Sequence, residues 1–387
     1  MTVRARIGVF TATRAEYGLL RPVLAAMETS ARLEPVLIVS GTHLSERHGR
    51  TLSEIEADRR TPAILIPVPL NGNAPADVAA DMAAVLAGLG AALPDLGLDA
   101  LMMLGDRTEV LAAAAAAVPF GLPILHLEGG HRTTGAVDDA IRHAVTKLSA
   151  LHFTAAEPYR QRILQLGEAP DRVFTVGSTA VETIRAARTD RATVARMLET
   201  DLEPGFLLVT FHPETLAAMS PADQIVAFLA GLATVKDRKL VITRPNADVG
   251  SEAVRAALDT FASERPDQVM LHESLGAARY AAALTACDAV VGNSSSGVIE
   301  APIAGVPSVN VGGRQDGRIK PPSVIDCVNR PDAVAEALTR ALDPAFIKVA
   351  RRQLAPFGDG DAPKRIVTIL EATDFTDLAR KPFVDRY

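Results

Sequence analysis

The sequence predicts an α/β protein made of two doubly wound domains that face each other across a cleft. Short apolar runs alternate with longer helical patterns along the chain. These runs lack the strict apolar–polar alternation of half-exposed strands, as expected for strands that are covered on both faces. The pattern also starts again near residue 204, after a polar helical stretch at 179–200. Repeated strand–helix–strand units imply parallel sheets with right-handed crossovers.

Short β-branched or aliphatic runs mark the predicted strands, and helices separate most of them. In the first half of the chain we place strands at 5–10, 34–40, 62–68, 99–104, 123–128, 151–155 and 173–177. In the second half we place them at 206–211, 239–244, 268–272, 289–293 and 307–312.

The length of the chain indicates two domains of ordinary size, because 387 residues exceed a single hydrophobic core. We expect the first domain at 1–178 and the second, nucleotide-binding domain at 179–365. A helix is predicted at 364–372, and the tail 366–387 is expected to pack back on the first domain. Ligands of such sheets bind where the carboxyl ends of strands line the cleft.

The composition favours a reduced, cytoplasmic enzyme. The formal net charge of −6 argues against a nucleic-acid partner, which would require a basic face. No window approaches the ~20 apolar residues that span a bilayer, and the N-terminal segment does not resemble a secretory signal. Cys287 and Cys327 form no metal-ligand pattern, so we expect no bound metal.

Two carboxylates follow neighbouring predicted strands. Asp106 comes between a strand and an Ala-rich helix, and Glu128 ends the next strand, before Gly-Gly. Adjacent strands lie ~5 Å apart, so the two carboxylates would repel, which would raise the pKa of one and suit it to proton transfer. The alternative is that Asp106 caps the helix, since Asp is a favoured N-cap residue. Glu128 at the next strand end favours the functional interpretation.

The stretch 126–143 gathers several titratable groups around a glycine turn. A helix is predicted to begin near Ala136, with Asp139, Arg142 and His143 on the face opposite its apolar stripe. Asp138 and Asp139 fall in the first turn, where the helix dipole already favours negative charge. This alternative explains one of the two acids, but not the glycine turn that directs the helix toward the strand ends.

The stretch 290–312 predicts an anion site in the second domain. A strand runs into Asn-Ser-Ser-Ser-Gly, and a helix follows. Backbone N–H groups, hydroxyls and the positive end of a helix together bind anions. The stretch is not a phosphate-loop lysine motif, so it does not require Mg²⁺. Glu300, about one turn into the helix, is placed to accept hydrogen bonds from ribose hydroxyls; its alternative role is dipole compensation.

Further candidates follow other strands. Arg14 and Glu16 follow the first strand and are expected beside a diphosphate. His212 follows the first strand of the second domain; a lone histidine is more often structural, but one opposite carboxylates is a candidate for catalysis. The loops 244–251 and 271–276, with Asn246 and His272, are candidates for a nucleotide-base pocket.

Taken together, these stretches resemble the bacterial hydrolysing UDP-N-acetylglucosamine 2-epimerases of sialic-type acid synthesis. The matching motifs include "TRAEYGLL", "GDRTEVLAAAAAA", "DAIRHAVTKLSALHF", "VTFHPET", "PNADVGS" and "GNSSSGVIEAP", and they run from residue 11 to about 327. The third and the last of these are highly specific as a pair. The resemblance implies two Rossmann-like domains in the GT-B-like arrangement.

The resemblance also implies a mechanism and roles for single residues. The enzyme would remove the proton on sugar carbon 2, expel UDP to leave a 2-acetamidoglucal, and add water to give N-acetylmannosamine. Asp106, Glu128 and Asp138 match acid, base or charge-stabilising positions, without a decision on which carboxylate is the base, and His212 matches a histidine near the leaving diphosphate. The candidate substrate-binding residues are Arg14, Glu16, His131, Asp139, Arg142, His143, Asn246, His272, Ser294, Ser295, Ser296, Gly297, Glu300 and Arg314. No cofactor is implied.

The sequence departs from the family pattern at two places. Many relatives have glutamate after the Gly-Gly pair and histidine before it, whereas this chain has His131 after it and Glu128 before it. The family's usual "GDRQ" is "GGRQ" at 312–315, without the acid. These changes bear on the substrate more than on the class of reaction.

Three alternatives remain open at this point. One is the same reaction on a UDP- or GDP-linked 2,4-diacetamido-trideoxy sugar, on the route to legionaminic acid. Another is a glycosyltransferase on the same fold, which would need an acceptor. The third is a non-catalytic nucleotide-sugar sensor, which the retained acids disfavour. By resemblance alone, a homodimer or homotetramer is expected.

Overall fold

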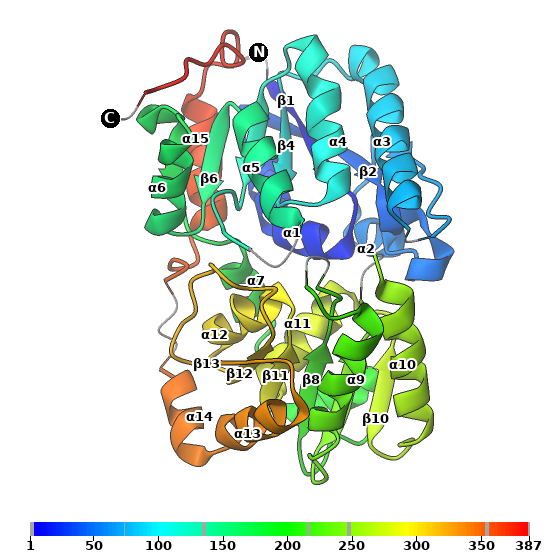
Figure 1. Cartoon of the computed structure of the whole chain (residues 1–387). Coiled ribbons are helices and arrows are strands. Elements are labelled where there is room, and N and C mark those ends of the chain that lie inside the picture. Colours follow the sequence, from blue (N-terminus) through cyan, green and yellow to red (C-terminus); the bar gives the residue numbers. More distant parts are fainter. Residues whose placement is uncertain are drawn as a thin grey trace. The chain divides into compact units, whose positions relative to one another are not determined.

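The chain divides into two compact units, each built around its own sheet (Figure 1). The computed structural model describes residues 4–72, 74–133, 137–214, 217–245, 249–352 and 356–385. Unit 1 consists of Met1–His131, Asp138–Glu182 and Phe357–Tyr387, and unit 2 consists of Arg132–Val137 and Thr183–Pro356. The predicted domain boundaries and the predicted cleft stay predictions.

Within the described residues of unit 1, seven parallel strands form one sheet in the order β3-β2-β1-β4-β5-β6-β7. The strands are β1 (Ala5–Thr11), β2 (Leu33–Ser40), β3 (Ile64–Ile66), β4 (Ala100–Leu104), β5 (Ile124–Leu127), β6 (Leu151–Thr154) and β7 (Val173–Thr175). Each lies within or beside a predicted strand. Strands β1, β4, β5 and β6 are mostly or wholly buried, which explains why their sequences are apolar without alternation.

Helices cover the faces of this sheet (Figure 1). They include α1 (Arg14–Glu28), α3 (Pro75–Leu96), α4 (Thr108–Ala117), α5 (Asp138–Leu148), α6 (Glu157–Gln165) and α15 (Ala362–Ala372). The short helix α2 (Leu52–Ala57) also belongs to unit 1, and α7 (Ala180–Ala186) crosses the boundary between the units. Helix α15 belongs to the C-terminal segment and contacts α1. Its Ile366, Val367 and Leu370 join the core that contains the buried residues of β1 and β2.

Unit 2 repeats this architecture on a smaller scale. Its described part holds a six-stranded parallel sheet in the order β10-β9-β8-β11-β12-β13. The strands are β8 (Phe206–Thr210), β9 (Lys239–Thr243), β10 (Val269–His272), β11 (Ala289–Gly292), β12 (Ser308–Val311) and β13 (Val324–Cys327). The helices are α8 (Arg191–Leu198), α9 (Pro221–Leu232), α10 (Ser251–Ser263), α11 (Gly276–Ala286), α12 (Glu300–Ala304), α13 (Pro331–Ala341) and α14 (Pro344–Ala350).

Both sheets reverse their direction of growth once, and this reversal defines where each unit presents its ligand-binding edge. In unit 1 the order reverses between β1 and β4, and in unit 2 between β8 and β11. Open α/β sheets bind ligands at such switch points, beyond the carboxyl ends of the strands. The predicted fold class, two Rossmann-like doubly wound domains, is therefore confirmed.

The structure changes three details of the predicted elements. The polar stretch 179–200 is two helices, because Asp190 caps α8 by accepting a hydrogen bond from the N–H of Thr193. Strand β13 lies at the edge of its sheet and was not predicted. The helix expected near Ala136, a residue outside the described ones, is described from Asp138 onward.

The sequence predicts no segment long and apolar enough to span a membrane, but helix α3 meets both criteria. Among the described helices it alone is long and apolar enough to cross a bilayer, with a mean hydropathy of 1.6 and 28% of that window buried. It nevertheless packs against α4 and β3, and its buried Asp81, Val85, Leu89 and Leu93 follow helical spacing along one face. These contacts are those of a helix that covers a sheet.

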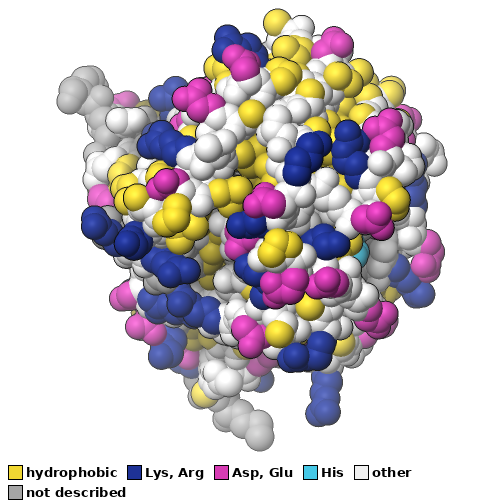
Figure 2. Space-filling model, turned by 90° about the horizontal axis from the view of Figure 1, so that it is seen from below, with side chains coloured by type: hydrophobic (Ala, Val, Ile, Leu, Met, Phe, Trp, Pro, Cys, Tyr) yellow, Lys and Arg dark blue, Asp and Glu magenta, His cyan; other side chains and the backbone are white. Residues whose placement is uncertain are grey.

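The surface carries charges of both signs. Figure 2 shows Lys and Arg side chains interspersed with Asp and Glu over the face seen from below. This mixture agrees with the small net charge of −6.

Candidate functional site

The two carboxylates predicted for unit 1 follow adjacent strands. Leu104 of β4 pairs with Leu127 of β5, and the N–H of Gly105 donates to the carbonyl of Leu127 at 3.1 Å. Asp106 and Glu128 come directly after these positions. The N-cap of α4 is Arg107 rather than Asp106, so the alternative in which Asp106 caps the helix is wrong.

Asp106 is held by a buried arginine of α5. Arg142, whose side chain is only 1% exposed, forms ion pairs with Asp106 and, at 3.1 Å, with Asp139. The same guanidinium group donates to the carbonyl of His131 at 3.1 Å. Buried charges require such pairing. Arg142 thus orients Asp106, and its predicted contact with substrate stays a prediction.

Glu128 has two donors of its own. The hydroxyl of Ser178 donates to Oε1 at 2.8 Å, and Oε2 lies 3.0 Å from Nε2 of His131. The backbone of Glu128 is left-handed, with φ of +61°. Non-glycine residues at positive φ concentrate at functional sites because the surrounding structure must hold them there.

The glycine turn after Glu128 is a steric requirement. Gly130 has φ of +81°, and a Cβ atom there would lie 2.3 Å from the carbonyl oxygen of Tyr159. The ring of Tyr159 stacks on the imidazole of His131 at 3.9 Å between centroids. Glu128 and His131, on the two sides of this turn, are in direct contact.

Helix α5 brings the remaining acids of the stretch to the same region. Asp138 and Asp139 occupy its first turn, where they also complement the helix dipole. Nε2 of His143 lies 3.7 Å from the Asp139 carboxylate. The expected repulsion between two bare carboxylates is replaced by an array in which Asp106, Glu128 and Asp139 each contact a basic side chain.

Glu16, which follows β1, is a carboxyl group with a clearly raised pKa. Its Oε2 accepts hydrogen bonds from the N–H groups of Ala12 and Thr13, at 2.8 and 3.2 Å, in a capping box for α1. Burial, followed by the charge of Glu109, raises its pKa to about 7. Arg14 begins α1. Glu16 therefore has a structural role that its predicted role in binding did not include.

In unit 2, His212 and the serine turn are fastened together by Asn293. The side chain of Asn293 accepts from the N–H of His212 at 2.7 Å and donates to its carbonyl at 2.8 Å. Asn293 precedes Ser294, and a Cβ atom on Gly292 would lie 2.0 Å from the carbonyl oxygen of Thr210. Strands β8 and β11 thus approach closely at the point where both candidates emerge.

The serine turn is a short 3₁₀ helix, Ser295–Gly297. Ser294 caps it by accepting from the N–H of Ser296, at 3.4 Å, and the hydroxyl of Ser296 donates to Ser294 at 3.1 Å. A Cβ atom on Gly297 would lie 2.8 Å from the hydroxyl of Ser308. Glu300 is the first residue of α12, so it lies at the start of the helix rather than one turn inside it.

Glu300 has a buried carboxylate oxygen, Oε2, without a hydrogen-bond partner among the described residues. Burial raises the pKa of this carboxyl group. A hydroxyl donor, such as that of a ribose, would satisfy the oxygen.

The "GGRQ" segment folds against the same turn. Arg314 and Gln315 both donate to the carbonyl of Asn293, at 3.3 and 2.8 Å. The N–H of Gly313 donates to both carboxylate oxygens of Glu214, at 3.2 Å each. A Cβ atom on Gly313 would lie 3.2 Å from the carboxylate of Asp316. An acid at position 313 would therefore meet two others, which gives a physical reason for the departure from "GDRQ".

The remaining candidates are less closely grouped. His272 ends β10, two strands away from β8 in the sheet, and burial together with Arg279 lowers its pKa. Asn246 lies outside the described residues. In the described part of the chain, no three His, Cys, Asp or Glu side chains are grouped in a way that could hold a metal ion.

Sequence reasoning missed several residues that build these sites. Asn293, Gln315 and Glu214 all lie within or beside the quoted motifs. An Asn directly after a buried strand is a signal for Asn293. The contact between Glu214 and Gly313 joins positions 99 residues apart and leaves no local signal.

The fold and these residues define the class of the protein, a two-domain Rossmann-like protein with GT-B-like architecture. The solved structure of the Methanocaldococcus jannaschii UDP-GlcNAc 2-epimerase, in complex with UDP-GlcNAc and UDP, has this fold. It aligns with a TM-score of 0.79 over 95% of this chain and 100% of that one, at 18% identity.

The sequence comparisons give the family. Residues 25–371 match the UDP-N-acetylglucosamine 2-epimerase family, and the chain belongs to it. The polysialic acid biosynthesis protein P7 of Escherichia coli is 31% identical over 97% of this chain and 96% of its own length. A Campylobacter jejuni protein, GDP/UDP-N,N'-diacetylbacillosamine 2-epimerase (hydrolyzing), is 32% identical over 99% of each. The Legionella pneumophila UDP-N,N'-diacetylbacillosamine 2-epimerase (hydrolyzing) is 33% identical over 93% and 94%.

Proposed function

We propose that this chain is a hydrolysing nucleotide-sugar 2-epimerase that converts UDP-N-acetylglucosamine and water into N-acetylmannosamine and UDP. One observation carries the proposal. Asp106 and Glu128 follow adjacent strands at the switch-point edge, and separate basic residues orient them. Paired carboxylates with fixed orientation suit proton transfer to and from one carbon.

The first step is an elimination. A carboxylate takes the proton from sugar carbon 2, the electron pair of that C–H bond forms the C1=C2 double bond, and the bond from carbon 1 to the diphosphate oxygen breaks. The products are 2-acetamidoglucal and UDP. Asp106, Glu128 and Asp138 are the candidates for this proton transfer. General acid–base catalysis contributes typically 10²–10⁴-fold to such a step.

The second step adds water across the double bond. The oxygen of a water molecule forms a bond to carbon 1 and the water gives one proton to a carboxylate. The electron pair of the C1=C2 double bond takes a proton from a carboxylic acid at carbon 2, on the opposite face, which inverts that centre. The fixed Glu128–His131 contact at 3.0 Å supports an acid that exchanges protons through an imidazole.

We assign the leaving diphosphate to unit 2. The hydroxyls and N–H groups of the serine turn are neutral donors for phosphate oxygens. Arg314 and His212 are anchored to the same Asn293, so both are candidates to stabilise the charge that develops on UDP. Glu300 would accept from the ribose.

A second substrate is favoured by the relatives. The Campylobacter jejuni and Legionella pneumophila proteins carry the names of diacetylbacillosamine 2-epimerases, which is the same reaction on a UDP- or GDP-linked 2,4-diacetamido-trideoxy sugar. The Escherichia coli relative carries a name from polysialic acid biosynthesis, which supports the N-acetylmannosamine route to sialic-type acids.

The test uses purified protein and no sugar acceptor. With UDP-N-acetylglucosamine in deuterated water, we expect free UDP and N-acetylmannosamine labelled at carbon 2. Chromatography detects the UDP, and NMR detects the label. Turnover of only the diacetamido sugar nucleotide would select the second substrate. UDP release that depends on an added acceptor, without label at carbon 2, would overturn the proposal in favour of a glycosyltransferase.

We further propose that the enzyme acts in the cytoplasm as a homodimer or homotetramer. Light scattering coupled to size-exclusion chromatography tests the assembly, because the 40.8 kDa chain gives well-separated masses for one, two and four copies.

A further inference from the structure

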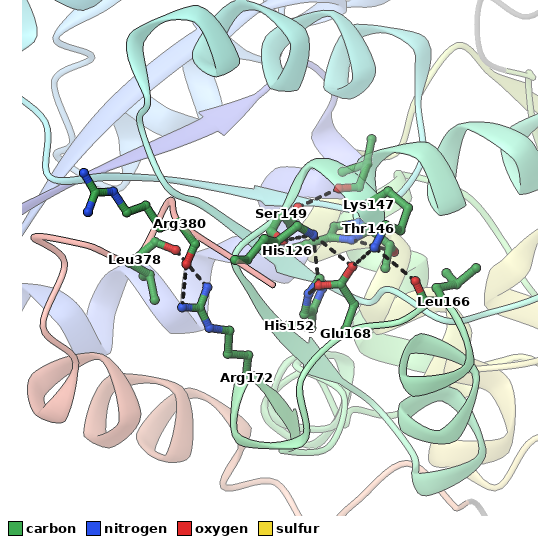
Figure 3. Close-up of polar contacts among 12 residues, drawn as sticks. His126, Thr146, Lys147, Ser149, His152, Leu166, Glu168, Arg172, Leu378 and Arg380 are labelled. Carbon is green, nitrogen blue, oxygen red and sulfur yellow. Dashed lines mark hydrogen bonds and ion pairs between the residues drawn. The ribbon is translucent and has the colours of Figure 1, made fainter. Parts of the chain in front are cut away.

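Two buried histidines lie side by side under the carboxylate edge of unit 1. His126 of β5 and His152 of β6 are paired in register, and neither side chain is exposed. Figure 3 shows both within one group of polar contacts. The proposed reaction uses neither residue, although His126 lies in the same stretch as Glu128 and His131.

His126 makes one hydrogen bond through each ring nitrogen. Its Nε2 lies 2.8 Å from the carbonyl oxygen of Gly105, and its Nδ1 lies 3.3 Å from the hydroxyl oxygen of Thr146. Burial lowers the pKa of His126 to about 4, so the ring is neutral near pH 7. A carbonyl only accepts, hence the proton resides on Nε2, and the Thr146 hydroxyl donates to Nδ1.

The carbonyl that accepts the hydrogen bond from His126 belongs to Gly105, the residue directly before Asp106. Gly105 has a left-handed backbone, with φ of +85°, and its N–H donates to Leu127 of β5. Both backbone polar groups of Gly105 are therefore held by β5, one through the backbone and the other through the ring of His126. Without that ring the Gly105 carbonyl would lose this hydrogen bond, and the backbone of Gly105 would keep only its N–H bond to β5.

Thr146 connects this arrangement to the other support of Asp106. It lies on α5 four residues after Arg142, on the same side of the helix. Arg142 binds the Asp106 carboxylate, and Thr146 orients the imidazole that binds the preceding carbonyl. The backbone and the carboxylate of the 105–106 turn are thus set by one helix and one strand.

We propose that His126 is a positioning residue for the epimerase reaction, which fixes Asp106 through the carbonyl of Gly105. This inference rests on the proposed function for its kinetic consequence. Its ring nitrogens bond to the carbonyl of Gly105 and the hydroxyl of Thr146 rather than to a candidate proton-transfer group, so we assign its effect to the position of Asp106. Displacement of a reacting group by about 1 Å costs on the order of 10²-fold in rate.

His152 supplies a matched control. It is equally buried, but its Nε2 lies 3.2 Å from Glu168, whose carboxylate also binds Lys147 and Lys381. Figure 3 shows Glu168 between His152 and Lys147. Loss of His152 disturbs the contact with the C-terminal segment rather than the catalytic edge.

The kinetic test compares two amides of different length. In His126→Gln the amide nitrogen is as many bonds from Cβ as Nε2, so it reaches Gly105; in His126→Asn it does not. We expect kcat to fall on the order of 10²-fold in His126→Asn, with KM within about threefold, and to recover by about tenfold in His126→Gln. His152→Asn should lower the melting temperature while kcat stays within about threefold. Equal kcat in His126→Asn and His152→Asn would overturn the inference.

A second measurement separates this inference from the proposed function. Backbone amide NMR shifts of Gly105 and Asp106 should move in His126→Asn, return in His126→Gln and stay in His152→Asn, whatever substrate the enzyme uses. If the wild-type protein turned over no nucleotide sugar, the proposed function would be wrong. The amide shifts would still test whether His126 fixes the backbone of Gly105 and Asp106. Unchanged shifts in His126→Asn would overturn this inference.

Discussion

The candidate sites of the two units contain different kinds of chemical group at the carboxyl ends of their strands. In unit 1 the groups after β4 and β5 are carboxylates, each contacted by a basic side chain. In unit 2 the groups after β8 and β11 are the imidazole of His212 and the hydroxyls and backbone amides of the serine turn, fastened in part by the uncharged side chains of Asn293 and Gln315. Both edges lie beyond the carboxyl ends of strands in sheets that reverse their order once; β8 and β11 flank the reversal in unit 2, and β4 borders it in unit 1.

This difference indicates that the same fold can support proton transfer in one unit and diphosphate binding in the other. Proton transfer requires ionisable groups whose protonation is controlled by fixed neighbours. Binding of a diphosphate requires preorganised donors, such as hydroxyls, backbone N–H groups and an arginine side chain. The comparison predicts that changes in unit 1 reduce kcat, whereas changes in unit 2 raise KM.

The largest effect is expected from neutralising the paired carboxylates. Glu128→Gln and Asp106→Asn should each lower kcat by about 10²–10⁴-fold, because each removes a proton-transfer group. UDP affinity, measured by calorimetry, should stay within about threefold of wild type. The control is Glu157→Gln, at an exposed glutamate after β6. Wild-type kcat in both edge variants would remove these carboxylates from the reaction.

A smaller effect concerns stability at the charged edge. Burial raises the folded-state pKa of Glu16 to about 7, above the ordinary glutamate value of 4.5. Between these values the unfolded chain has lost a proton that the folded chain keeps, so the free energy of unfolding falls as pH rises and levels off above pH 7. The full difference is on the order of 3 kcal/mol. Glu16→Gln should lack this decline in urea unfolding at pH 5 and pH 8; parallel pH profiles in the two proteins would contradict the assignment.

The serine turn should show the opposite kinetic signature. Ser294→Ala removes a hydroxyl that caps the turn, and hydrogen bonds to charged groups are worth about 1.5–3 kcal/mol. We expect the KM for the sugar nucleotide to rise at least about tenfold and kcat to change less. Ser263→Ala, at an exposed serine of α10, is the control. A drop in kcat with unchanged KM would erase the contrast between the two units.

The smallest effect tests the missing acid of the "GGRQ" segment. Gly313→Asp places a carboxylate near Glu214 and Asp316, so like charges should lower stability by about 1 kcal/mol at low salt. Gly313→Asn, with similar size and no charge, should be less affected. Equal stability of the two variants in thermal unfolding would show that charge is not the reason for glycine here.

Local pattern predicted most of the strands, because a strand buried on both faces is a short apolar run bounded by turns. Strand β13 escaped notice since Val324–Cys327 includes an exposed aspartate at the edge of its sheet. The break between α7 and α8 had a signal, Asp190, in the position of an N-cap.

The candidate site was predicted where function follows from position along the chain. Residues just after strands, such as Asp106, Glu128 and His212, required only the topology of a parallel sheet. Their partners could not be predicted, because Arg142 meets Asp106 across 36 positions and Ser178 meets Glu128 across 50. Such contacts depend on packing angles that no local pattern encodes.

The return of the C-terminal segment to unit 1 has a consequence for how the protein is made. Ile366, Leu370 and Leu378 fill the same core as Ile7 and Val9 of the first strand. Unit 2 has its last residue at Pro356. During synthesis, the N-terminal part of unit 1 therefore leaves the ribosome before the residues that complete its core. We expect unit 1 to finish folding only after unit 2 and helix α15 have been synthesised.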